Sequence, residues 1–274
     1  MFEKILENVR KSEPIVHVIT NYVTVNDCAN IILAAGGSPT MADCKYEVED
    51  VTSIANSLVI NIGTLNGEST QAMLKAGKKA NELGHPVILD PVGVGSSKFR
   101  DEFTFDLLKE VDFSVIRGNI SEIKTIYKGS GTTKGVDADE RDMVTDENID
   151  ETIDFIKELS RKTGAIIAVT GAIDIVSSNE KTYIIRNGHP LMTRVTGTGC
   201  MLTTVIGSFC GANSNNILEA TAAAVCAMGI CGELGYDKLE EVGGGTLTYR
   251  TYIIDFMSKM DSKILNGGAK IEIR

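Results

Sequence analysis

Short β-branched runs alternate with segments of helical period over the first two thirds of the chain. We expect the apolar runs to be strands, and they span residues 15–19, 58–62, 87–89, 114–116 and 165–169. The segments between them repeat apolar residues at helical spacing, over residues 26–35, 47–56, 69–83, 99–110, 121–127 and 149–163. Strands that are apolar on both faces are typical of a parallel sheet covered by helices on both sides. The alternation therefore predicts a layered α/β sandwich.

The pattern changes after residue 170. Two short β-branched runs, 173–176 and 182–186, predict an antiparallel hairpin added to the sheet. Long helical stretches follow, and the small residues on several of their faces predict close packing over the sheet; they span residues 200–210, 216–233 and 246–260. We interpret residues 1–274 as one domain and the polar stretch 128–148 as a long surface loop.

Net charge and cysteine spacing exclude several classes of protein. The formal net charge of −10 argues against nucleic acid and anionic membranes as partners, because both require a basic surface. The six cysteines contain no C-x-x-C pair, so neither a zinc site nor a disulfide framework is expected. Residues 1–14 lack the apolar run of a signal peptide, and no stretch approaches the length of a membrane span. We therefore expect a cytoplasmic protein with reduced thiols.

Polar residues follow four of the predicted strands, at the end where parallel α/β sheets bind their ligands. The residues that end these strands are Asn21, Asp90, Arg117 and Thr170. Each one alone fits an ordinary turn or helix cap, where Asn, Asp and Thr are common. Their recurrence at one edge of the sheet favours a ligand site.

A glycine-rich segment precedes the first of the late helical stretches. Residues 195–200 read VTGTGC, and the apolar run 201–206 follows directly. Backbone N–H groups that converge at such a helix start can hold a phosphate or a developing phosphoryl charge. A tight glycine turn before a buried helix is the alternative interpretation. Neither a Walker loop nor a dinucleotide-binding G-x-G-x-x-G follows an early strand.

Several characteristic segments extend over nearly the whole chain: VITNYV at 18–23, GGSPTMA at 36–42, LVINIGTL at 58–65, ILDPVGVG at 88–95, IRGN at 116–119 with Glu122, and VTGTGC at 195–200. Together they resemble the hydroxyethylthiazole kinase family of the ribokinase-like superfamily. The resemblance implies a three-layer ribokinase-like sandwich with a mostly parallel central sheet. It also implies ATP-dependent phosphorylation of the hydroxyl group of 4-methyl-5-(2-hydroxyethyl)thiazole in thiamine salvage.

The resemblance implies roles for individual residues. Asn21 and Met41 are similar to thiazole-pocket contacts of the family, and Gly197 to a contact of both the substrate and the anion hole. The nucleotide contacts it implies are Arg117, Thr170, Gly197 and Gly199, and the acidic pair that organises Mg²⁺ is Asp90 with Glu122. The family forms trimers with the substrate between subunits, so we expect a homotrimer. Read alone, Met41 could be core, Glu122 a first-turn acid and Arg117 the partner of a structural acid.

Cys200 departs from the wider superfamily, in which an aspartate base follows the Gly-x-Gly, and agrees with the narrower family. A thiol at a helix N-terminus can have a lowered pKa and accept the alcohol proton, whereas a buried free cysteine is more often inert. Alternatives remain from related functions: a kinase for a hydroxymethylpyrimidine, pyridoxal or a sugar, and an ATP-dependent dehydratase that repairs a hydrated nicotinamide cofactor. The absent aspartate disfavours the dehydratase, and a ligand-binding protein without catalysis has no feature in its favour.

Overall fold

One sheet runs through the computed structural model, which describes residues 2–129 and 143–274. Its strands lie in the order β2-β1-β3-β4-β5-β6-β7-β8-β9. The first six in this order are mutually parallel, and β7, β8 and β9 are antiparallel to their neighbours. The strands are β1 Ile15–Ile19, β2 Ser38–Thr40, β3 Ser57–Asn61, β4 Val87–Asp90, β5 Val115–Asn119, β6 Ile166–Thr170, β7 Asp174–Ser177, β8 Thr182–Ile185 and β9 Ile271–Ile273.

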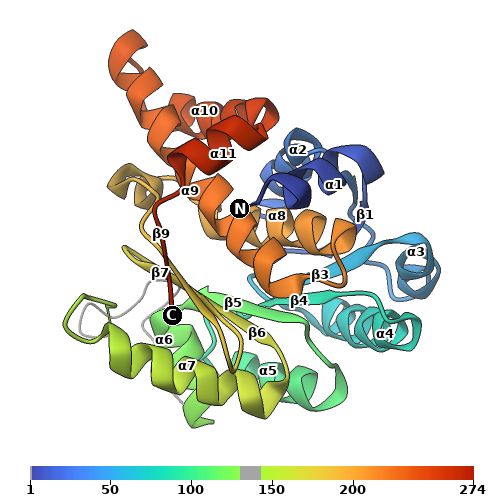
Figure 1. Ribbon diagram of the computed structural model, residues 1–274. Helices are drawn as coiled ribbons and strands as arrows, with labels where there is room; N and C mark the ends of the chain where they lie inside the picture. The colour runs from blue at the N-terminus through green and yellow to red at the C-terminus, as the bar shows by residue number, and fades with distance from the viewer. Residues whose placement is uncertain (1, 130–142) are drawn as a thin grey trace.

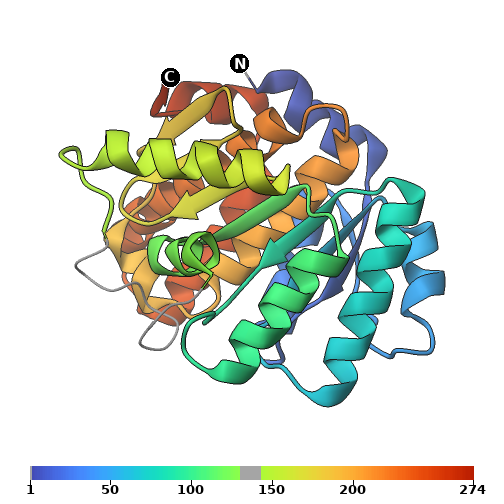
Figure 2. The ribbon, with the colours of Figure 1, turned by 90° about the horizontal axis from the view of Figure 1, so that it is seen from below.

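Helices cover both faces of this sheet, so the protein has three layers (Figure 1). One face carries α1 Glu3–Ser12, α2 Val25–Ala35, α8 Thr198–Ala212, α9 Ile217–Val242, α10 Thr246–Lys259 and α11 Ser262–Gly268. The opposite face, turned towards the viewer in Figure 2, carries α3 Val48–Ile54, α4 Gly67–Leu83, α5 Lys98–Glu110, α6 Ile120–Lys128 and α7 Ile149–Thr163. The predicted three-layer α/β class with a mostly parallel sheet is confirmed.

The two apolar cores follow from the alternation of side chains along each strand. In β3, Val59 joins the core under α8 and α9, while Leu58 and Ile60 join the core under α4 and α5. In β4, Ile88 lies in the first core and Leu89 in the second. Both faces of these strands are therefore buried, as the continuous apolar runs predict.

The predicted elements are largely confirmed, with shifts at their ends. The five predicted strands and the antiparallel hairpin are present, and the helix predicted to end at residue 233 continues to residue 242. Among the described residues, five elements were not predicted: α1, β2, the 3-10 helix Pro190–Arg194, α11 and β9. The predicted surface loop 128–148 lies mostly outside the described residues.

Helix α9 corrects one expectation from the sequence. By length and composition it could cross a membrane, with a mean hydropathy of 1.6 over its most apolar window. The expectation that no stretch has this character is therefore wrong. However, 72% of that window is buried inside the protein, where α9 packs against α8 and α10. Its apolar composition is explained by its place in the core.

Candidate active site

Asp90 is the most deeply buried acid at the carboxyl edge of the sheet. It ends β4 opposite Asn61, which ends β3. Its Oδ2 accepts hydrogen bonds from Asn61 Nδ2 at 2.7 Å and from Thr203 Oγ1 of α8 at 2.9 Å. Its Oδ1 has no hydrogen-bond partner among the described residues, and the nearest cation is Arg117 Nη1 at 3.5 Å. Burial raises the pKa of Asp90, and Arg117, Thr203 and Asn61 oppose that rise.

Two amide groups meet at the thiol of Cys200. Asn21 Nδ2 and Asn61 Nδ2 each lie 3.3 Å from Cys200 Sγ, and Asn21 also donates to Asn61 Oδ1 at 3.0 Å. The cluster Asn21–Asn61–Cys200–Asp90 therefore joins the ends of β1, β3 and β4 to the start of α8. The structure thus brings Asn21 and Asp90, from two strand ends, together with the helix that follows the glycine-rich segment.

The thiol of Cys200 has a higher pKa than the sequence suggests. The possibility that a helix N-terminus lowers this pKa is contradicted, because burial raises the pKa of Cys200 and the nearby Asp90 raises it further. The amide of Asn21 acts in the opposite direction, since a donated hydrogen bond favours the thiolate. In this structure the thiol is therefore protonated at neutral pH.

Arg117 connects the end of β5 to the end of β6 and to α8. Its Nη2 donates to Thr170 Oγ1 at 2.5 Å. A Cβ atom on Gly199 would lie 2.5 Å from Arg117 Nη1, so only glycine permits this approach. Gly197, with φ of 89°, begins the turn into α8, and a Cβ there would lie 2.6 Å from Thr24. A guanidinium and the first turn of a helix thus lie side by side, which favours an anionic ligand.

Glu122 lies in the first turn of α6 and is almost fully buried. Its two carboxylate oxygens accept hydrogen bonds from the backbone N–H groups of Gly93 and Asn119, both at 2.8 Å. Asn119 caps the same helix, and the local structure confirms the interpretation of Glu122 as a first-turn acid. Burial, with Asp90 as a second cause, raises the pKa of Glu122 to about 7. The two acids are thus close enough to interact.

Comparison with known proteins identifies the family. The sequence profile of the hydroxyethylthiazole kinase family matches residues 6–263. A hydroxyethylthiazole kinase from Clostridium acetobutylicum is 57% identical over 272 residues, which is 99% of this chain and 99% of that protein. The chain belongs to the hydroxyethylthiazole kinase family.

Solved structures agree with this membership. A hydroxyethylthiazole kinase protein from Pyrococcus horikoshii has a TM-score of 0.87 and 33% identity, over 100% of this chain and 98% of that one. A ribokinase-like superfamily protein from Enterococcus faecalis has a TM-score of 0.63 at 12% identity, over 94% of this chain and 95% of that one. The second likeness concerns the fold alone, and it agrees with the ribokinase-like architecture expected from the sequence.

Met41 is the sequence-predicted site residue of this family member with a large apolar side chain. It follows the edge strand β2 and packs, partly buried, against the core under α8 and α9. No hydrogen bond joins its segment to Asn21 or Cys200 among the described residues. The structure of one subunit therefore groups Asn21, Asp90, Arg117, Thr170, Gly197, Gly199 and Cys200 around one edge of the sheet, with Glu122 beside them.

Two residues of the cluster were not predicted. Asn61 donates to both Asp90 and Cys200, and Thr203 donates to Asp90. Thr203 stands inside an apolar helix and has no local sequence signal, and Asn61 stands inside an apolar run that obscures it. A weak signal was available for Asn61, because it occupies a strand end like Asn21 and Asp90.

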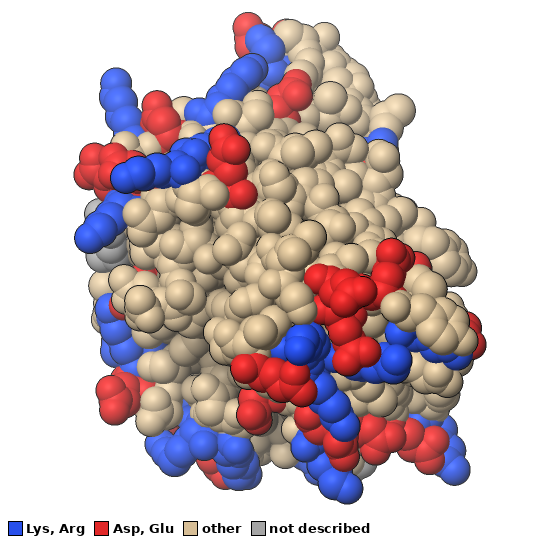
Figure 3. Space-filling view, turned by 90° about the vertical axis from the view of Figure 1, so that its right-hand side faces the viewer, with Lys and Arg blue, Asp and Glu red and all other residues tan. Residues whose placement is uncertain are grey.

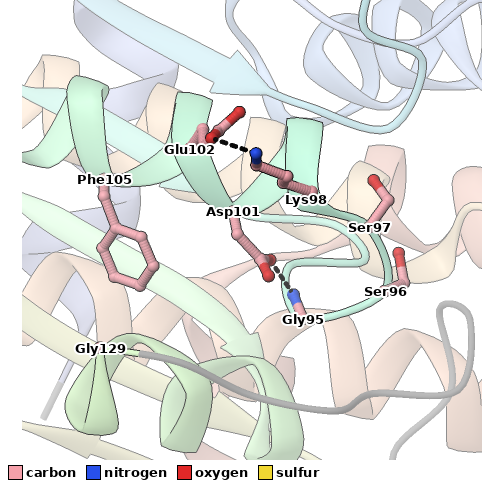
Figure 4. Close-up of a pocket in the computed structure, with 8 residues that line it drawn as sticks. All are labelled: Gly95, Ser96, Ser97, Lys98, Asp101, Glu102, Phe105 and Gly129. Atoms are coloured by element: carbon pink, nitrogen blue, oxygen red, sulfur yellow. Dashed lines mark hydrogen bonds and ion pairs between the residues drawn. The ribbon is translucent and has the colours of Figure 1, made fainter.

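A separate hollow of about 420 Å³ lies at the start of α5 (Figure 4). Its lining residues are Gly95, Ser96, Ser97, Lys98, Asp101, Glu102, Phe105 and Gly129. None of the predicted site residues lines it. We assign ligand binding and catalysis to the polar cluster instead. In the described part of the chain, only this cluster combines buried acids, a guanidinium and a glycine-rich helix start.

Proposed function

We propose that this protein transfers the γ-phosphoryl group of ATP to the hydroxyl group of 4-methyl-5-(2-hydroxyethyl)thiazole, as a cytoplasmic step of thiamine salvage. Family membership and the names of the relatives support the thiazole alcohol as acceptor. The observation that carries the proposal is the position of Cys200, directly after Gly197-Thr198-Gly199, where the amides of Asn21 and Asn61 reach its Sγ. An alcohol bound there would face the start of α8.

The chain's own residues supply a site for the transferred phosphoryl group. The N–H groups in the first turn of α8 have no acceptor within the helix, so they can bind phosphoryl oxygens. Arg117, held by Thr170, would bind the nucleotide phosphates from the opposite side. In the reaction the alcohol oxygen bonds to the γ-phosphorus, the bond to the ADP oxygen breaks, and the hydroxyl loses its proton. Phosphoryl transfer depends chiefly on such positioning and charge stabilisation.

With the alcohol bound at the start of α8, Cys200 would lie beside the proton that is released. Only its thiolate can accept a proton, and burial keeps the thiol protonated in this structure. The two amide donors of Asn21 and Asn61 would stabilise the thiolate when it forms. We therefore propose that Cys200 assists the reaction by a limited amount, and that the helix start and Arg117 contribute more.

We also propose that Asp90 and Glu122 hold Mg²⁺, directly or through water. The buried Oδ1 of Asp90, which lacks a hydrogen-bond partner among the described residues, fits this assignment. Carboxylate oxygens are the ligands that Mg²⁺ prefers. Bound there, the metal would neutralise part of the phosphate charge. The backbone N–H groups of Gly93 and Asn119 fix the Glu122 carboxylate for this purpose.

A homotrimer with the site between subunits completes the proposal. Figure 3 shows a wide area without charged side chains across the middle of this face, whereas charged side chains gather lower down. Helix α2 has one charged residue, Asp27, and it is largely buried. Tyr22 is 80% exposed although its neighbour Asn21 is buried, and Tyr46 is 82% exposed. Large exposed apolar side chains beside a ligand site favour a partner surface. In such a trimer Asn21 and Met41 would come from neighbouring subunits and line one thiazole pocket.

A substrate comparison tests the proposed activity. The full-length protein is assayed with ATP and Mg²⁺ for ADP release, and the phosphate ester is identified by ³¹P NMR. We expect kcat/KM for the thiazole alcohol to exceed that for hydroxymethylpyrimidine, pyridoxal and ribose by 100-fold or more. A higher value for any of these competitors, or ADP release without a phosphate ester, would contradict the proposal.

A further inference from the structure

Arg100 binds three backbone carbonyl groups from two separate loops. It lies in the first turn of α5, where Ser97 caps the helix. Its Nη1 donates to Ile62 O at 2.5 Å and to Val92 O at 2.8 Å, and its Nη2 donates to Gly63 O at 2.7 Å. Ile62 and Gly63 follow β3, and Val92 follows β4. One guanidinium therefore fixes the spacing of the two loops that leave the site edge of the sheet.

The loop after β3 leads directly to the amide pair. Gly63 N donates to Asn61 Oδ1 at 2.9 Å. A Cβ atom on Gly63 would lie 2.9 Å from Asn21 Nδ2 and from Asn61 Oδ1, so this backbone is in contact with both amides. A shift of Gly63 would consequently move the two groups that reach the thiol of Cys200.

The loop after β4 leads directly to Glu122. Gly93 N donates to Glu122 Oε1 at 2.8 Å. Arg100 packs against the same glycine, because a Cβ atom there would lie 3.6 Å from its Cδ and Nε atoms. Gly93, with φ of 73°, adopts a left-handed conformation that this contact and the Val92 hydrogen bond help to hold.

We propose that Arg100 is a positioning residue. By holding the two loops, it fixes the position of the Glu122 carboxylate relative to the Asn21–Asn61 amide pair. It thereby fixes the position of the metal relative to the alcohol during phosphoryl transfer. Among the described residues, its hydrogen bonds go to backbone carbonyl groups, and none joins it to the nucleotide residues Arg117 and Thr170. Donors that hold a site to within a fraction of an ångström can control turnover without contacting substrate. The inference rests on the proposed function: its alcohol half on the thiazole alcohol as substrate, and its metal half on the Mg²⁺ site proposed at Asp90 and Glu122.

The competing explanation is that Arg100 only satisfies three carbonyl groups and stabilises the fold. A purely structural residue would change the fraction of active protein, and thus kcat, without changing affinity for metal or alcohol. Metal affinity and the KM of the alcohol are therefore the measurements that separate the two explanations.

The experiment compares the wild type with Arg100→Met, Arg100→Lys and the control Lys109→Met. Lys109 is an exposed cation on the same helix. For each protein, kcat, both KM values and the half-saturating Mg²⁺ concentration are measured, and the Kd of Mn²⁺ in the presence of ADP is determined by EPR. We expect Arg100→Met to lower kcat at least tenfold and to raise the Mn²⁺ Kd and the alcohol KM at least fivefold. The KM of ATP should stay within twofold of the wild type.

Arg100→Lys should show smaller changes in the same parameters, because one ammonium group can replace only part of the fork of donors. If Arg100→Met does not fold, the comparison of Arg100→Lys with the wild type provides the test. The control should behave like the wild type. An unchanged Mn²⁺ Kd and alcohol KM in both Arg100 variants would overturn the inference. If the wild type fails to phosphorylate the thiazole alcohol, the proposed function fails, and the Mn²⁺ Kd ratio alone then supports or overturns the role of Arg100.

Discussion

Cys200 shows how burial can outweigh a local sequence signal. Its place at a helix start would favour a thiolate, but the surrounding protein and the charge of Asp90 raise the pKa of the thiol. The same buried position brings the amides of Asn21 and Asn61 to its Sγ. At neutral pH only a small fraction of Cys200 is therefore thiolate and able to accept a proton, which limits the rate it can contribute.

Replacement of Cys200 tests that limit. We expect Cys200→Ala to lower turnover by about 100-fold or less, because general-base assistance at the low end of its range is lost while the helix start remains. Cys200→Asp should retain more activity than Cys200→Ala, since a carboxylate can accept the proton and the two amides can bind it. Turnover is compared at saturating ATP and thiazole alcohol, with thermal melting as the folding control. Equal turnover of wild type and Cys200→Ala would rule out proton acceptance by the thiol.

Arg117 carries the second prediction about a single residue. Arg117→Ala should lower kcat/KM for ATP by roughly 10- to 150-fold, the equivalent of losing a charge-assisted hydrogen bond worth about 1.5 to 3 kcal/mol. The KM of the thiazole alcohol should change less. Steady-state kinetics with Arg161→Ala, an exposed arginine on α7, as control would measure both effects. Unchanged ATP kinetics would remove Arg117 from the nucleotide site.

The residues of the candidate site were predictable to different degrees. Asp90, Arg117 and Thr170 are visible in the sequence because each polar residue ends an apolar run. The role of Thr203 could not be predicted, because the residue lies within an apolar helix and reaches Asp90 only when α8 packs over β4. The contacts of Arg100 could not be predicted either. Its partners are backbone carbonyl groups, which every residue carries, so the sequence does not indicate which of them it binds.

At the scale of elements, the tight turn between β6 and β7 contains a buried acid. Asp174 Oδ1 accepts a hydrogen bond from Gly171 N at 2.9 Å, and burial raises the pKa of Asp174 to about 7. A carboxyl group with a raised folded-state pKa stabilises the fold at low pH. Its contribution is lost as the pH rises from the unfolded-state pKa, near 4, through about 7.

Asp174→Asn should remove this dependence, because the amide oxygen can still accept from Gly171 without becoming charged. We expect the variant to exceed the wild type in free energy of unfolding by more than about 1.4 kcal/mol at pH 8, the equivalent of one pKa unit, and to match it at pH 4. Urea denaturation at both pH values measures the difference. Asp106→Asn, at an exposed position on α5, should show no such pH dependence. A wild type as stable as Asp174→Asn at pH 8 would contradict the prediction.

The elements missed from the sequence are those whose pattern is too short or too polar. Strand β2 consists of Ser38-Pro39-Thr40 at the edge of the sheet, where proline is tolerated. Strand β9 alternates Ile271, Glu272 and Ile273, and three residues are too few for a periodic signal. Both strands exist because β1 and β8 offer unpaired backbone groups. Their formation depends on the completed sheet, whereas the long apolar strands are apparent from local sequence.

At the scale of the whole molecule, the proposed trimer links assembly to activity. Dilution below the assembly concentration should lower oligomer mass and turnover together, because the thiazole pocket would lose the residues of one subunit. Light scattering and kinase assays over the same concentration range measure both. A monomer with full thiazole affinity and turnover would show that one subunit is sufficient.

A charged substitution on the exposed surface of α2 tests the proposed trimer interface without dilution. Leu33 of α2 is 58% exposed, and Val242 at the end of α9 is 52% exposed. If the face that carries α2 is the interface, Leu33→Asp should weaken assembly while Val242→Asp leaves it intact. Equal oligomer mass for the two variants would place the interface elsewhere.

The packing of α8 has a consequence for biosynthesis. Helix α8 covers one face of β1, β3 and β4, so closely that a Cβ atom on Gly207 would lie 2.6 Å from Val59. A ribosome completes these strands by residue 90, but α8 begins about 100 residues later. During that interval the nascent sheet lacks the helix that packs directly on β1, β3 and β4, and exposed apolar surface of this kind attracts other chains. The order of segments along the chain therefore leaves part of this surface open to other chains until α8 has been made, although the finished protein buries it.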